Sequence, residues 1–124
     1  MNFGNIAVSA TTLGTAVLAP AGTRTNTGGV TLPATVGTVA AASFTVSGQA
    51  SYNYAITLPS SCVITDAGHT MTVNNFTSIP ATTGTLSGTG SQTLNVGATL
   101  NVAAAQASGT YTNATGVAVT VNYN

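Results

Sequence analysis

Alternation of apolar and polar residues with a period of two restricts the fold of this chain more than any other feature. In residues 94–102 the even positions, Leu94, Val96, Ala98, Leu100 and Val102, are all apolar. Residues 117–123 repeat the alternation and keep valine on one face. Successive side chains of a β-strand point to opposite faces, so both segments predict strands with one buried face. No helical stripe free of glycine or β-branched residues competes with them, and the chain is predicted to be all-β.

Further stretches rich in threonine, valine, tyrosine and isoleucine read as strands between turns that contain glycine or proline. The predicted strands are residues 6–8, 15–19, 30–32, 41–47, 52–58, 63–65, 70–76, 85–87, 93–102 and 110–123. Many short strands favour an antiparallel two-sheet sandwich, formed by one domain of residues 1–124. A β-solenoid is the rival architecture, but it requires a regular repeat and the turns here are irregularly spaced.

Residues 93–102 contain the tetrapeptide TLNV twice, which raises the alternative of a hairpin with Gly97-Ala98 as its turn. That hairpin would place Val96 opposite Thr99 and so mix the apolar and polar faces. A single strand keeps every apolar residue on one face. We therefore expect one long strand, kinked or bulged at Gly97.

Charged residues make up only 2% of the chain, whereas 44% is hydrophobic. Arg24 and Asp66 are the only charged side chains, and His69 is the only histidine. Such a neutral surface has no electrostatic field to attract nucleic acid or an acidic membrane, so neither is expected as a partner. Every apolar run is too short to cross a bilayer, so membrane insertion is not expected either. This composition is typical of a secreted or cell-surface protein.

Asp66 and His69 flank the predicted turn Ala67-Gly68 and are the only candidates for catalytic chemistry. A catalytic interpretation would make His69 a base, oriented by Asp66, for a nucleophilic Ser60 or Ser61. A metal interpretation would add Cys62, but the ligand set lacks a second histidine or a cysteine pair. An exposed turn with a weak ion pair is the simpler reading. We therefore expect no catalytic, metal or cofactor site, and no enzymatic activity.

Three other features have simple structural interpretations. Arg24 lies in a predicted loop, where it would pair with Asp66 or bind strand carbonyls; a ligand contact is the alternative to these two partners. Cys62 is expected to be a buried, inert thiol. The functional alternative is that it forms a disulfide between subunits. The threonines of residues 23–27 are isolated and carry the charge of Arg24, so cross-strand preference explains them better than an ice-binding array.

A series of short motifs, in order along nearly the whole chain, resembles the bacterial domain-of-unknown-function 4402 family. These motifs are NFGNIAV (residues 2–8), GTRTNTGGV (22–30), FTVSG (44–48), YAITLP (54–59), MTVNNF (71–76), VGATL (96–100), GTYT (109–112) and VTVNY (119–123). The resemblance implies an exported Gram-negative surface protein similar to chaperone–usher pilins. Those subunits have incomplete immunoglobulin-like sandwiches that a strand from a neighbouring subunit completes. A tyrosine next to the C-terminus, here Tyr123, is a common pilin ending.

Family members carry an alternating apolar donor segment before the Phe-Gly motif, whereas Phe3-Gly4 begins this chain. The expected donor is therefore absent from this sequence, and three interpretations stay open. The chain is trimmed, a segment within residues 5–19 serves as the donor, or the domain closes on itself. Residues 1–4 also lack the features of a signal peptide, so an exported chain of this kind would be a mature or truncated form.

The sequence thus predicts an immunoglobulin-like or pilin-like antiparallel sandwich, completed by a neighbour's strand. Its expected function is that of a structural subunit of an extracellular filament on the bacterial surface. Expected partners are copies of itself, a periplasmic chaperone and an outer-membrane usher. The alternative is a self-complete secreted adhesin or glycan-binding module that uses Tyr52 or Tyr111. The candidate subunit contacts are Ile6, Val8, Val117, Val119, Val121 and Tyr123.

Overall fold

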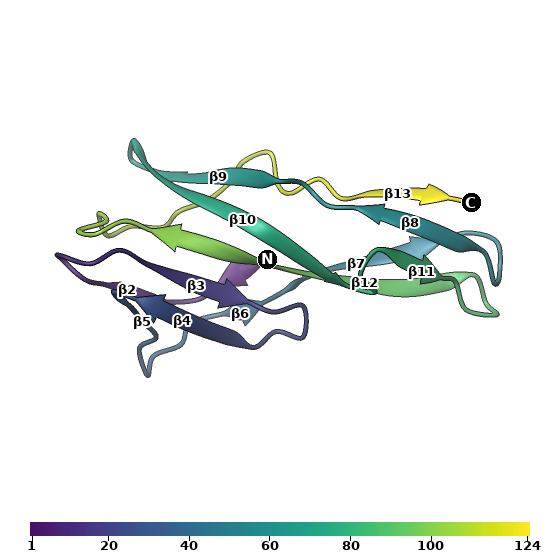
Figure 1. Ribbon diagram of the computed structural model, residues 1–124, viewed down its shortest axis with the longest axis horizontal. Coiled ribbons are helices and arrows are strands. Elements are labelled where there is room, and N and C mark those ends of the chain that lie inside the picture. The colour runs from purple at the N-terminus through teal and green to yellow at the C-terminus, as the bar shows by residue number, and fades with distance from the viewer.

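A computed structural model describes residues 1–124 and contains only β-strands, all paired antiparallel. The larger sheet has six strands, with β4, β3, β12, β10 and β9 in that order and β7 also paired with β12. Their bounds are β3 (Gly14–Leu18), β4 (Arg24–Gly28), β7 (Ala42–Ser47), β9 (Ser61–Asp66), β10 (His69–Ile79) and β12 (Ser91–Val102). The predicted all-β sandwich is confirmed, because a second sheet packs on this one (Figure 1).

Strand β12 is the centre of the large sheet and runs along the long axis of the molecule (Figure 1). It pairs with β10 on one edge, while β7 and β3 share its other edge. Residues 91–96 pair with β7, and residues 98–102 pair with β3. The change of partner falls at Gly97, where the backbone of Leu18 to Pro20 approaches too closely for a side chain. The prediction of one long strand is confirmed, but the bulge predicted within it at Gly97 was wrong, because the irregularity of the register beside Gly97 lies in another strand.

That irregularity is a bulge in the neighbouring strand β10. Asn74 pairs with Thr99 and Thr77 with Gly97, so Asn75 and Phe76 together face Ala98. Asn75 has a φ of 48°, a conformation that asparagine tolerates better than most residues. The bulge shifts the inward-facing positions of β10 from odd to even, so that Val73 and Ser78 are both buried.

The smaller sheet has three strands, with β8 (Asn53–Thr57) between β11 (Thr83–Thr85) and β13 (Thr120–Tyr123). It covers the first half of β12, where apolar residues from both sheets form one core cluster. This cluster contains Val46, Tyr54, Leu86, Leu94 and Val96. The small sheet therefore covers only one end of the larger sheet.

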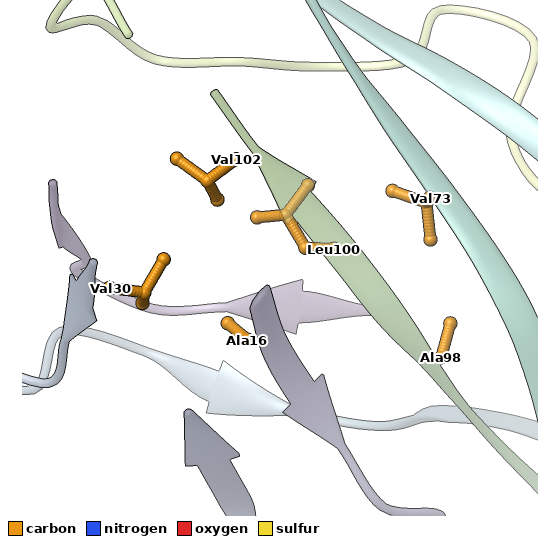
Figure 2. Packing of buried hydrophobic residues seen from close by; sticks show 6 residues of the cluster. All are labelled: Ala16, Val30, Val73, Ala98, Leu100 and Val102. Atoms are coloured by element: carbon orange, nitrogen blue, oxygen red, sulfur yellow. The ribbon is translucent and has the colours of Figure 1, made fainter. Parts of the chain in front are cut away.

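A second core cluster lies under the other half of β12 and contains Ala16, Val30, Val73, Ala98, Leu100 and Val102 (Figure 2). Two short ribbons lie at this end, one of β1 (Asn2–Phe3) with β6 (Val39–Ala40) and one of β2 (Ala7–Val8) with β5 (Val30–Thr31). Phe3 and Ile6 pack against the cluster. The N-terminal segment thus supplies here the cover that the small sheet supplies at the opposite end.

Two predicted elements were wrong. Residues 110–123 do not form one strand, since only residues 120–123 belong to β13 and Thr112 makes an isolated bridge to Thr65. The intervening chain must cross from the large sheet to the small one. Asn113 forms a turn there, in which its Oδ1 accepts a hydrogen bond from the backbone N–H of Thr115. Residues 24–28 were predicted to be a loop but form β4, in which Thr27 hydrogen-bonds Thr15 across the strand pair at 2.7 Å.

We predict that Gly97→Ala destabilises the domain by about 1–3 kcal/mol, because its Cβ would overlap the Leu18 carbonyl oxygen. Gly88→Ala is the matched control, since a Cβ there has no atom within 4 Å and should change stability by less than about 0.5 kcal/mol. Urea unfolding of both variants measures the difference. Equal stability of the two variants would contradict the close approach of β3 and β12.

Candidate functional site

An apolar groove of about 420 Å³ lies between β7 of the large sheet and β13 of the small sheet. Its lining comes from three strands and the residue that leads into β13: Phe44, Thr45, Val46, Ser47, Leu94, Val119, Val121 and Tyr123. No charged residue is among them. The groove is therefore suited to apolar side chains and to backbone groups.

The groove exists because each of its two bordering strands has only one partner. Strand β7 pairs only with β12, and β13 pairs only with β8. Each strand therefore keeps one edge whose backbone N–H and C=O groups have no ladder partner. The two sheets are open along this border.

The floor of the groove belongs to the core of the domain. Leu94 is 1% exposed and Val46 is 5% exposed. Val119 and Val121 are half-buried and pack against the same cluster, whereas Phe44 keeps 37% of its surface exposed. The groove is thus a partly uncovered section of the core.

Tyr123 connects the two sheets at the border of the groove. Its hydroxyl donates a hydrogen bond of 2.6 Å to the Ser47 carbonyl oxygen, which links β13 to β7. Its ring lies 6.4 Å from the ring of Tyr54, with the planes tilted by 59°. The tyrosine next to the C-terminus therefore helps to fix the spacing of the two sheets.

Tyr54 is fully buried beneath this contact and donates a hydrogen bond of 2.7 Å to Oε1 of Gln92. Its strand neighbour on β11 is Gly84, where a Cβ would overlap the Tyr54 ring. Burial raises the pKa of the Tyr54 hydroxyl, and the neighbouring Tyr123 raises it further. The neutral phenol is therefore the form that the folded state favours.

The predicted contact residues divide between the two ends of the molecule. Val119, Val121 and Tyr123 line the groove, and Val117 is half-buried in the chain leading to it. Ile6 packs against the opposite core cluster, and Val8 pairs with Val30 in the β2–β5 ribbon. The structure therefore brings the C-terminal candidates together but not the N-terminal ones.

Sequence reasoning missed the opposite wall and the floor of the groove, namely Phe44, Val46 and Leu94. Their alternating pattern was visible and predicted two strands correctly. Nothing in the pattern indicated that β7 would have a free edge facing β13.

Residues 5–19, one of the segments considered as a donor, are used within the domain in this structure. Strand β2 pairs with β5, and β3 lies between β4 and β12. Arg24 fastens the chain just before β2, since its Nη1 donates hydrogen bonds of 2.6 Å and 2.7 Å to the carbonyl oxygens of Phe3 and Asn5. Of its two predicted partners, Arg24 therefore binds carbonyls and not Asp66.

The residues considered for catalysis are spread along a hairpin. Asp66 and His69 pair across a two-residue turn, in which Ala67 and Gly68 both have positive φ as the predicted turn requires. His69 is exposed. Ser61 pairs with Asn74 at the far end of the same ladder, roughly 17 Å from His69 at the usual rise of a strand. His69 therefore cannot activate Ser61 in this fold.

Cys62 lies one position along β9 from Ser61, so it is also far from the Asp66–His69 pair. Its side chain is half-buried against the second core cluster, and burial raises the pKa of its thiol. The prediction of a buried cysteine is therefore met only in part, because Cys62 lies at the edge of the core and keeps some exposure.

These observations define the structural class of the protein as a β-sandwich with an open, uncharged groove at one border. The family model described as domain of unknown function DUF4402 matches residues 1–123, and the chain belongs to that family. The comparisons with curated proteins and with solved structures gave no match. The structure contains no helix that could span a membrane.

We predict that the stability of the domain falls as pH rises above about 10, because the unfolded chain then loses the Tyr54 proton that the folded state retains. The Tyr54 contribution is complete below that pH and disappears as the hydroxyl of the folded state ionises. Tyr54→Phe should flatten this alkaline fall, whereas Tyr52→Phe, at an exposed ring, should not. Unfolding measured as a function of pH tests this, and an unchanged slope in Tyr54→Phe would contradict it.

Proposed function

We propose that this protein is a structural subunit of an extracellular filament on the bacterial cell surface, and that its copies join by β-strand addition. The observation that carries the proposal is the apolar groove between the free edges of β7 and β13. A strand of another copy, laid in this groove, pairs with the exposed backbone and places alternate side chains over Leu94 and Val46. The donor itself is a segment with apolar residues at every second position.

The energetics favour a long-lived joint. Four or five apolar side chains entering the groove would contribute on the order of 10 kcal/mol before the cost of ordering the donor. Backbone hydrogen bonds along the two strand edges add directionality to this apolar contact. A joint that is closed over the core separates slowly, which gives the filament kinetic stability.

The lack of charge supports the same function. No charged residue lines the groove, and only 2% of the chain is charged. Assembly by apolar burial and backbone pairing therefore depends little on salt. A charge-poor surface also offers trypsin a single cleavage site, after Arg24, which suits a protein exposed outside the cell.

The assembly partners follow from the resemblance to chaperone–usher pilins. Before assembly, a periplasmic chaperone would cover the groove with its own strand, and an outer-membrane usher would exchange that strand for the donor of the next subunit. An uncovered groove between two free strand edges otherwise promotes aggregation, which gives such a chaperone a physical role.

We expect electron microscopy of native protein sheared from the cell surface to show regular filaments. An SDS gel of the unboiled sample should show a ladder of multimers, because strand-joined copies separate slowly. Discrete particles that run as monomers without boiling would overturn the filament proposal. That result would favour the self-complete binding module instead.

A charge placed in the groove should stop assembly without unfolding the subunit. Phe44→Arg puts a guanidinium at a partly exposed position that lines the groove, so donor binding would bury an unpaired charge. Val63→Arg, at a side chain of β9 that is 48% exposed and outside the groove, is the matched control. The SDS-resistant ladder should disappear in Phe44→Arg and persist in Val63→Arg. A ladder of equal intensity in both variants would show that this groove is not the joint.

A further inference from the structure

We propose that the outer face of the large sheet carries a second site, which binds a neutral saccharide. A hollow of about 380 Å³ lies where β3 and β10 begin and β12 ends. Its volume falls within the ~300–1,000 Å³ range of small-molecule sites. It shares no lining residue with the groove between β7 and β13, and its lining residues Asn101 and Val102 lie at the opposite end of β12 from Leu94.

The lining of the hollow includes a row of uncharged polar residues that are in register across three strands. Asn101 of β12 pairs with Thr15 of β3 on one side and with Thr72 of β10 on the other. These positions alternate with the buried Leu100 and Val102, so they face outward from the core. Thr70 extends the row along β10, and both Thr70 and Thr72 are exposed.

Two side-chain amides in this hollow are held by their NH₂ groups. Nδ2 of Asn101 donates to the Thr72 carbonyl oxygen at 3.1 Å and to Oδ1 of Asn74 at 2.9 Å. Nε2 of Gln106 donates to the Thr70 carbonyl oxygen at 3.3 Å and to the Tyr111 hydroxyl at 2.7 Å. The Tyr111 hydroxyl in turn donates to the Ala107 carbonyl oxygen at 2.8 Å. Both amides are therefore fixed with their carbonyl oxygens left as acceptors for a ligand.

The chemistry of this lining selects the class of ligand. Fixed amide oxygens accept hydrogen bonds from hydroxyl groups, and the hydroxyls of Thr70 and Thr72 both donate and accept. Leu13, whose side chain is 69% exposed, adds an apolar wall for the C–H face of a sugar ring. None of Arg24, Asp66 and His69 lines the hollow, so an ionic ligand would find no counter-charge. A neutral saccharide satisfies all these groups.

This site does not depend on strand addition, because the two sites have no residue in common. If subunits do join through the groove, however, each copy would present one saccharide site along the filament. Weak binding by each hollow would then be strengthened by multivalency on a surface that carries many copies of the ligand.

The test titrates the isotope-labelled full chain with cellohexaose, maltohexaose and the acidic hexamer of galacturonic acid, each to millimolar concentration, and follows the side-chain amide resonances by NMR. We expect at least one neutral hexamer to shift the resonances of Asn101 and Gln106, and the acidic hexamer to have no effect. Absence of any shift with both neutral sugars would overturn the proposal, as would tighter binding of the acidic hexamer.

Matched variants then locate the site. The double substitution Thr70→Val and Thr72→Val replaces two exposed threonines with valine, which has the same shape but no hydroxyl. It should weaken neutral-sugar binding by about tenfold or more. The control replaces Thr77 of β10 and Thr93 of β12, which are exposed residues outside the hollow, with valine. Equal weakening in both double variants, or in neither, would contradict this position for the site.

Discussion

The backbone hydrogen bonds of β12 to three other strands are the interaction on which the rest of the structure depends. Strand β12 pairs with β10 along one edge and with β7 and β3 along the other. Its even-numbered side chains enter both core clusters, so one strand connects the two ends of the molecule. One of these inward side chains, Leu94, lines the groove. Alternation sends the odd-numbered residues outward, and one of them, Asn101, lines the hollow on the outer face.

The two ends of β12 are covered differently, and this difference creates the groove. At the end near β3, short ribbons and the N-terminal segment fastened by Arg24 complete the packing. At the end near β7, the small sheet covers the core but stops at β13, so two strand edges remain unpaired. Unpaired edges beside apolar side chains promote aggregation of a monomer, and the same edges allow copies to join in a polymer. The proposed strand addition would give both edges partners and cover Phe44.

Local patterns predicted most strands but failed where distant contacts decide the conformation. Residues 93–102 were predicted correctly because only a single strand keeps their apolar side chains together. Arg24 was predicted to lie in a loop of threonine, asparagine and glycine, yet residues 24–28 form β4, because β3 offers them a partner and a cross-strand threonine contact. Residues 117–123 alternate as a strand would, but residues 117–119 belong to the segment that crosses between the sheets, and only residues 120–123 pair with β8. Three of the eight residues that line the groove, Val119, Val121 and Tyr123, followed from the same kind of pattern.

The sequence by itself determined the class of fold, the buried face of the central strand and the near absence of charge, because alternation and composition are local properties. Only the tertiary structure decided which strand edges stay unpaired and that Phe44 and Val46 stand across a groove from Val121. Backbone pairing uses the same N–H and C=O groups at every residue, so side-chain pattern alone does not specify the partner of each edge. That choice depends on how the two sheets pack over β12, and it places the groove at one end and the hollow at the other.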